Sequence, residues 1–184
     1  MSIDGMLNDA GVLVAGRIVF HLPSLVEIKA NVEELVDVDQ FVRVLGIYVQ
    51  TNEYTLFRDH TTSGPPTFGF GDLVVDDRVE IRAVLDGDSV IATRLERDDP
   101  DDVVTLKALV DSVDADARSI TMLAVPVTSD DNTIFQNAAH VEIDAETFFD
   151  LVEIDSIVRT EGIYEDDVIK ANRMLLRVCT STCL

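Results

Sequence analysis

The chain has 184 residues and a formal net charge of −21, because 35 Asp and Glu outnumber 14 Lys and Arg. Hydrophobic residues make up 47% of the sequence, which is too many for an acidic disordered chain, so we expect a folded protein. The composition also argues against two classes: the sequence lacks a long apolar stretch for membrane insertion, and its charge disfavours nucleic-acid binding.

The pattern of apolar and polar residues predicts β-structure along most of the chain. Turn residues at 8–11 and 86–88 are typical of hairpins. Runs in which apolar and charged residues alternate predict half-buried strands at 26–30, 79–83 and 104–108. One short segment, 145–151, has a helical pattern. The predicted fold class is therefore all-β.

The sequence resembles itself when it is laid over a shifted copy of itself. With an offset of 78 residues, 26–59 falls on 104–137 without a gap, and with an offset of 79 residues 79–94 falls on 158–173. A repeat of this length corresponds to a small domain, because solenoid rungs are much shorter. We therefore predict two tandem copies of one small β domain.

A third, partial copy is predicted at the start of the chain. Residues 14–18 resemble 91–95 and 170–174, so the N-terminal β-hairpin is interpreted as the end of a truncated preceding repeat; a native hairpin packed on the first domain is the alternative. Pro-containing segments at 20–24 and 98–102 are interpreted as linkers. The predicted domains are the C-terminal hairpin of the truncated repeat at 1–19, β-barrel repeat 1 at 25–97, β-barrel repeat 2 at 103–178 and a flexible tail at 179–184.

Each predicted copy is expected to form a small OB-like β-barrel, with a β-sandwich as the alternative. Closure into a barrel removes the exposed strand edges that a small flat sheet would have. The alternation breaks at 45–46 and 123–124, which we interpret as a bulge or sharp bend in the second strand of each copy. Small residues at matching points, Gly5, Ala83 and Gly162, predict another crowded bend.

A series of short motifs recurs in both copies: Thr-x-Phe, then Asp-Leu after a variable loop, then Val-x-x-x-Gly, then Ala-x-Arg followed by an apolar residue. These motifs occupy 55–57, 72–73, 79–83 and 92–95 in the first copy, and 133–135, 150–151, 158–162 and 171–174 in the second. Ala83 departs from the usual Gly. The pattern resembles the bacterial domain-of-unknown-function family 5666. The resemblance implies tandem OB-like repeats in an exported protein that is periplasmic, lipid-anchored or extracellular, and it brings no assigned catalytic residues.

The most specific repeated signature consists of Thr55 with Phe57 and Thr133 with Phe135. We interpret it as structural, with each Phe in the core and each Thr hydroxyl bonded to a neighbouring loop. The alternative is a binding edge with an aromatic platform.

Three arginines, Arg17, Arg94 and Arg173, recur at equivalent positions. Structural salt bridges to the acidic loops are favoured. A clamp for a substrate carboxylate is the alternative, because Arg can bind a carboxylate with two parallel hydrogen bonds.

The remaining motifs give little support for chemistry. Acidic runs at 86–88, 98–102, 130–131 and 165–167 invite a calcium interpretation, but they lack EF-hand spacing. The three His are scattered, and no nucleophile elbow or phosphate-binding loop is present in the sequence. Cys179 and Cys183 could form a disulfide or remain free thiols.

We therefore predict a non-enzymatic repeat module of a cell-envelope or secreted protein with a structural, adhesive or protein-interaction role. Its expected partners are neighbouring repeats of the same polypeptide and a protein or glycan, and no cofactor, metal, nucleic acid or membrane insertion is expected. The alternative is a ligand- or calcium-binding module that uses the acidic turns and the long loops at 58–72 and 136–150. A hydrolase-type enzyme is the third possibility.

Overall fold

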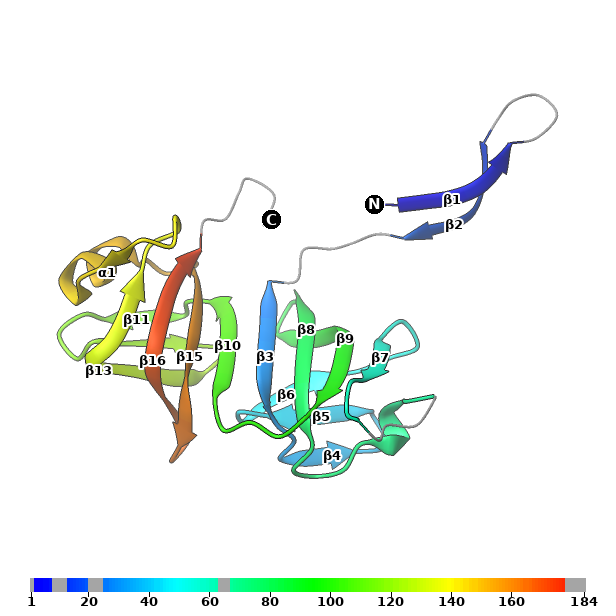
Figure 1. The fold of residues 1–184 in the computed structure, drawn as a ribbon, viewed down its shortest axis with the longest axis horizontal. Helices are drawn as coiled ribbons and strands as arrows, with labels where there is room; N and C mark the ends of the chain where they lie inside the picture. The colour runs from blue at the N-terminus through cyan, green and yellow to red at the C-terminus, as the bar shows by residue number, and fades with distance from the viewer. Residues whose placement is uncertain (1, 8–12, 20–24, 63–66, 178–184) are drawn as a thin grey trace.

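The computed structural model describes residues 2–7, 13–19, 25–62 and 67–177. In these residues the chain is built almost entirely of β-strands, with one short α-helix and one 3-10 turn (Figure 1). The predicted all-β class is confirmed. We refer to residues 26–98 as the first half and to 104–177 as the second half.

The first half contains the strands and the 3-10 turn that surround the first sequence copy. They are β3 (Val26–Asn31), β4 (Glu34–Val36), β5 (Phe41–Val44), β6 (Ile47–Gln50), β7 (Leu56–Asp59), η1 (Phe70–Asp72), β8 (Arg78–Asp86) and β9 (Ser89–Asp98). The expected alternation appears in β3, where every second side chain is buried.

The second half has a matching series of elements. They are β10 (Val104–Leu109), β11 (Ser112–Asp114), β12 (Ser119–Met122), β13 (Val125–Gln136), β14 (Glu142–Ile143), α1 (Ala145–Leu151), β15 (Ile157–Glu165) and β16 (Val168–Arg177). In the alignment of the two copies, the starts of β10, β11 and β12 correspond to those of β3, β4 and β5, and the starts of β15 and β16 correspond to those of β8 and β9. The single strand β13 covers the positions of both β6 and β7.

Within each half the order of the strands returns on itself. The first half runs β3-β8-β9-β6-β5-β4, and its two end strands are separated in the chain by only Val32 and Glu33. Val32 donates its N–H to Asp77 O at 2.8 Å, whereas Glu33 donates to Arg43 O at 2.8 Å, so the chain changes partner between these two residues. Because one bent segment pairs on both sides, this half has no long free strand edge within its described residues.

The second half closes in the same way. Its strands run β10-β15-β16-β13-β12-β11, and Val110 and Asp111 separate the end strands. Val110 N donates to Ser156 O at 2.9 Å and Asp111 N donates to Thr121 O at 2.8 Å. In both halves the third segment lies parallel to the last strand, through β6 and β7 with β9 and through β13 with β16.

The two halves are joined more closely than the sequence suggested. Antiparallel pairing of β3 with β10 makes a continuous 14-stranded sheet, and the buried side chains of both halves form one hydrophobic cluster. The segment 98–102, interpreted as a linker, connects the end of β9 at Asp98 to the start of β10 at Val104, which lies beside β3. The two halves therefore share a sheet and a core.

The breaks in alternation at 45–46 and 123–124 are turns and not bulges. Leu45 and Gly46 have φ values of 51° and 74°, and Leu123 and Ala124 have φ values of 50° and 62°, which places both pairs in the left-handed region typical of two-residue hairpin turns. The true bulges come later, at Arg82/Ala83 and Glu161/Gly162. The crowded bend predicted at Gly162 is confirmed there, because a Cβ atom at this residue would lie 2.1 Å from Lys170 O.

The predicted helix is confirmed with the expected bounds as α1. Asp144 caps its first turn by accepting the Thr147 N–H at 2.8 Å. Phe148 and Phe149 are buried and pack against Phe135, with ring centroids 5.0 and 5.9 Å apart. The helix therefore covers one end of the second half, at the place where the first half has only the turn η1.

The N-terminal strands β1 (Ser2–Leu7) and β2 (Leu13–Val19) form a separate two-stranded sheet. A bulge between Asp4 and Gly5 leaves Asp4 opposite Arg17. The bulges in the two halves leave Arg94 opposite Arg82 and Arg173 opposite Glu161. The hairpin thus has the register of the last hairpin of each half. The tail at 179–184, with both cysteines, and the segment 20–24 lie outside the described residues.

Candidate functional site

The Thr residues of the repeated signature connect two neighbouring strands. Thr55 Oγ1 donates to Ala92 O at 2.8 Å, and Thr133 Oγ1 donates to Ala171 O at 2.7 Å. Each hydroxyl also accepts a backbone N–H, and both Thr are buried. The hydroxyl thus donates to a strand carbonyl beside the bulge, and for Thr55 the donor to the hydroxyl is Asn52, in the turn between β6 and β7, which is the expected loop contact. For Thr133 the donor is Asp130, within β13 itself.

The Phe residues of the signature differ in burial. Phe135 is buried under α1, whereas Phe57 is only partly buried and meets Phe68 edge to face at 6.3 Å between ring centroids. These positions face the core, so they offer no platform to a ligand.

The repeated arginines pair with carboxylates on strands and not with the acidic loops. Arg94 contacts Glu96 on its own strand, and Arg173 Nη1 lies 3.4 Å from Glu161 Oε2 on the neighbouring strand. The side chain of Arg17 lies outside the described part of the structure. Both described arginines lie on the same outer surface of the sheet, which we call the charged face.

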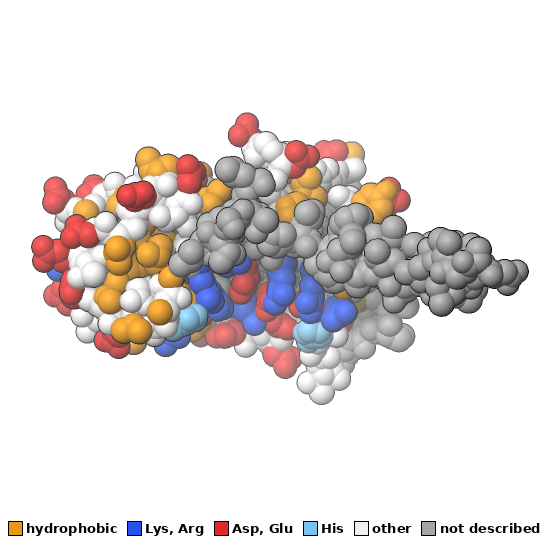
Figure 2. Space-filling view, turned by 90° about the horizontal axis from the view of Figure 1, so that it is seen from above, with side chains coloured by type: hydrophobic (Ala, Val, Ile, Leu, Met, Phe, Trp, Pro, Cys, Tyr) orange, Lys and Arg blue, Asp and Glu red, His pale blue; other side chains and the backbone are white. Residues whose placement is uncertain are grey.

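The charged face is the solvent side of β16, β15, β10, β3, β8 and β9, together with the ends of the two long loops. Directly paired residues on these strands place their side chains on one side of the sheet. Figure 2 shows Lys, Arg and acidic side chains gathered there between two His. More than half of the chain's 14 Lys and Arg lie on this face: Lys29, Arg58, Arg82, Arg94, Lys107, Arg159, Arg173 and Arg177.

At the first-half end of the charged face, acidic groups balance the cations. Lys29 Nζ lies 2.9 Å from Asp98 Oδ2 and 3.5 Å from Glu80 Oε2, and the bond to Asp98 raises the pKa of Lys29. His60 Nδ1 lies 3.4 Å from Asp98 Oδ1, and His60 Nε2 lies 3.3 Å from Glu96 Oε1. Glu96 is only 4% exposed. This end is therefore a closed network in which carboxylates occupy the space between the cations.

The second-half end of the face carries cations at the corresponding positions. In the alignment of the two copies, Glu80 corresponds to Arg159, Glu96 to Leu175, and Asp98 to Arg177. A hollow of about 220 Å³ lies here, lined by Gln136, His140, Arg159, Glu161, Arg173, Leu175 and Arg177. We call it the arginine hollow.

Glu161 is the acidic group in the lining of the arginine hollow. Its two carboxylate oxygens lie 3.2 Å from Arg159 Nη2 and 3.4 Å from Arg173 Nη1. Arg177 Nη1 instead lies 3.0 Å from His140 Nε2. Because Arg can only donate, His140 Nε2 must be the unprotonated acceptor nitrogen in this contact.

The neighbouring Lys107 and its counterpart Lys29 have pKa values shifted in opposite directions. Burial lowers the pKa of Lys107, and the guanidinium groups of Arg177 and Arg159 lower it further, against the opposing effect of Glu27. Its counterpart Lys29, among carboxylates, has a raised pKa.

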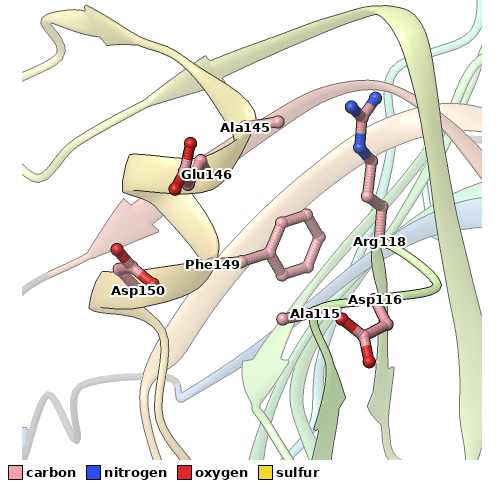
Figure 3. A pocket seen from close by; sticks show the side chains of 7 residues that line it. All are labelled: Ala115, Asp116, Arg118, Ala145, Glu146, Phe149 and Asp150. Atoms are coloured by element: carbon pink, nitrogen blue, oxygen red, sulfur yellow. The ribbon is translucent and has the colours of Figure 1, made fainter.

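A second hollow of about 220 Å³ lies between α1 and the turn after β11 (Figure 3). The Phe149 ring projects toward it, and the carboxylates of Asp116, Glu146 and Asp150 point in different directions around it (Figure 3). Arg118, which also lines it, is paired with Asp131 at 2.7 Å. The polar groups do not converge, so this hollow has no defined chemistry.

The described residues offer neither a metal site nor a membrane-spanning helix. In that part of the chain, no group of three or more His, Cys, Asp or Glu is placed to hold a metal ion. The described helices are too short and too polar to cross a bilayer.

Comparison with protein families matches residues 26–96, from the start of β3 into β9, to the family described as Domain of unknown function (DUF5666). The family resemblance seen in the sequence is therefore confirmed over the first half. Neither the curated proteins nor the solved structures contain a match to this chain.

Sequence reasoning singled out Arg173, and its ligand-binding alternative included the loop 136–150, which carries Gln136 and His140. It missed Arg159 and Arg177. The signal was present in the aligned copies, because Arg159 and Arg177 replace acidic residues of the first copy. Identities between the copies do not reveal it, because it consists of reversals of charge.

Proposed function

We propose that the chain is a non-enzymatic interaction module, made of two OB-like β-barrels, that binds an acidic protein partner through the charged face. An OB-fold is a small five-stranded Greek-key barrel. If β3 with β4 and β6 with β7 are each counted as one bent strand, the first half has five strands whose order closes on itself. This topology supports the OB-like interpretation, and the matching second half supports a tandem repeat.

The clustering of cations on the charged face is the observation that carries the proposal. In a chain of net charge −21, a random distribution would leave few places where an acidic partner is attracted. Most of the Lys and Arg instead lie on one side of the sheet. They lie on both sides of the seam, which we define as the pairing of β3 with β10 that joins the halves. Complementary charge of this kind increases the rate and specificity of association.

The place of the module in a larger protein is also part of the proposal. The family resemblance supports an exported protein at the bacterial envelope with further repeats in the same polypeptide. The calcium-binding alternative has no supporting observation among the described residues, and it stays a prediction.

A binding titration tests the proposed function. A labelled poly-L-glutamate chain is titrated with the protein at low and at high ionic strength, and saturable binding that weakens with salt is expected. Replacing Arg82 and Lys107 with Gln removes two charges from the centre of the charged face and should weaken binding. The matched control replaces Arg43, on β5, and Arg118, in the turn after β11, with Gln, because both lie away from this face. Equal weakening in both double variants, or no saturable binding at low salt, would contradict the proposal.

A further inference from the structure

We infer that the arginine hollow is a binding site for a single carboxylate, of the kind carried by a glutamate side chain of the acidic partner. The inference rests on the proposed function and deepens it, since it assigns the contact point within the charged face. It depends on three observations: the internal comparison of the two halves, the unbalanced cations, and the shape of the hollow.

The first half shows what occupies this position when the chain fills it itself. There, the carboxylates of Glu96 and Asp98 lie among Lys29, Arg94 and His60. In the second half the residues at these two carboxylate positions are Leu175 and Arg177. Both acidic groups are therefore absent from the position at which the first half has two.

Two of the cations that hold those carboxylates have counterparts in the second half. Arg173 corresponds to Arg94 and Lys107 corresponds to Lys29. Arg159 and Arg177 add two further cations at positions that are acidic in the first half. The second half thus lacks the two carboxylates of Glu96 and Asp98, and its nearest acidic groups are Glu161, beside Arg159 and Arg173, and Glu27, whose Oε1 lies 3.6 Å from Arg159 Nη2.

The contacts of the arginine hollow leave capacity for one more anion. Glu161 is shared between Arg159 and Arg173, at 3.2 and 3.4 Å, and Glu27 Oε1 lies 3.6 Å from Arg159 Nη2, so among the described residues neither carboxylate forms an ion pair with Arg177. Within the described part of the chain, the side-chain partner of Arg177 is His140, whose Nε2 lies 3.0 Å from Arg177 Nη1. The Arg159 Nε atom is buried without a hydrogen-bond partner in the described structure. Buried donors of this kind are costly unless an acceptor reaches them.

The shape of the hollow favours a carboxylate on a short aliphatic stem. Its volume of about 220 Å³ suits a side chain and not a flat surface contact. Leu175, which is 5% exposed, contributes an apolar wall at the position of the buried Glu96. A glutamate side chain would place its methylene groups against Leu175 and its carboxylate among Arg159, Arg173 and Arg177, which can bind it in bidentate fashion.

The test uses N-acetyl-L-glutamate amide as the probe, with amide chemical shifts followed by NMR during the titration. Saturable shifts are expected for residues around Arg173 and Arg177. The R177D substitution places in the hollow the residue type that the first half has at Asp98, so the hollow should be filled internally and binding should weaken roughly tenfold or more. The matched control is R82Q, which removes one charge from the same face outside the hollow, and it should bind the probe as the unmodified protein does.

The outcomes separate this inference from the proposed function. Retained probe binding in R177D, or equal weakening in R82Q, overturns the site. Inorganic phosphate that binds the hollow more tightly than the probe overturns the assignment of a carboxylate. R177D could keep full affinity for poly-L-glutamate while the Arg82 and Lys107 double variant loses it. That result would support the charged face as the binding surface and would reject the arginine hollow as its contact point. Loss of probe binding in R177D, with R82Q unaffected, supports the inference.

Discussion

Ile28 lies directly opposite Leu106 in the antiparallel pair of β3 and β10, and the two residues occupy equivalent positions in the two halves. On one side of this pair Glu27 faces Lys107, and on the other Lys29 faces Thr105. Because Glu27 is equivalent to Thr105 and Lys29 to Lys107, these two flanking pairs are exchanged with each other when the halves are exchanged. A local pseudo-two-fold axis therefore passes between Ile28 and Leu106. The seam joins the same strand edge of each half, as an isologous dimer interface does.

This symmetry limits how further copies could associate. An isologous contact is closed, because the edge of β3 is paired with the equivalent edge of β10 and neither edge is left free for a third copy. A third copy could not extend the sheet by the same pairing. Any further repeat in the polypeptide would therefore attach by a different contact, and the hairpin of β1 and β2 does form a sheet of its own.

The seam predicts a cooperative effect of substitutions on stability. Ile28 and Leu106 are both fully buried. We expect I28A and L106A each to reduce the free energy of unfolding by about 2–5 kcal/mol, because each leaves a cavity in the shared core. The double variant should be non-additive by about 0.5 kcal/mol or more, because the residues are in one packed pair. Urea denaturation of the four proteins measures this, and V38A, at a side chain 92% exposed, is the control. Strict additivity would show that the seam does not couple the halves.

Gly162 predicts a steric effect that its counterpart in the first half does not share. A Cβ atom at Gly162 would lie 2.1 Å from Lys170 O and 2.9 Å from the Ala171 Cα, which are backbone atoms. We expect G162A to lower the free energy of unfolding by about 1–3 kcal/mol or more, because the bulge between β15 and β16 must open to admit the methyl group. The control is G69A, where a Cβ atom would meet nothing within 4 Å. Similar melting temperatures for the two variants would refute the steric argument.

The fold was largely predictable from the sequence because local patterns determine most of it. Alternation at 26–30 and 104–108 corresponds to β3 and β10, and the helix begins and ends where its pattern does. The turns at 45–46 and 123–124 were misinterpreted because Leu and Ala rarely adopt positive φ. Their sequences carry little turn signal beyond Gly46. In the structure, Glu33 and Asp111 accept the N–H groups of Gly46 and Ala124, at 3.1 and 3.0 Å, from a distant part of the chain.

The seam and the arginine hollow could not be predicted in the same way. Pairing of β3 with β10 depends on two strand edges that meet only after each half has closed, and no local pattern records it. The hollow combines residues from a loop and three strands, β13, β15 and β16. Its charge depends on the lack of a carboxylate at Leu175 as well as on the arginines that are present. Only a position-by-position comparison of charge between the two copies would have indicated it.

The ion pair of Asp59 and Arg97 predicts a change of stability with pH. The Asp59 side chain is 2% exposed and contacts Arg97 Nη2, and Thr61 donates to it from both its backbone N–H, at 2.9 Å, and its hydroxyl, at 2.7 Å. The bond from Arg97 is the main cause that lowers the pKa of Asp59 from 3.8 to about 2, with burial opposing it. Because the folded-state pKa is depressed, the stabilisation is complete above the unfolded value and is lost as the pH falls through about 2.

The substitution D59N should therefore be less stable than the unmodified protein at neutral pH, and the difference should shrink as the pH falls from about 4 to about 2. Urea midpoints measured across this range test it. Many other carboxylates titrate in the same window, so only the difference between the two proteins carries the argument. The matched control is D131N, at a side chain 93% exposed, which keeps the Asp59 pair and should follow the unmodified protein throughout. A constant difference between D59N and the unmodified protein at all pH values would show that Asp59 contributes by its shape and not by its charge.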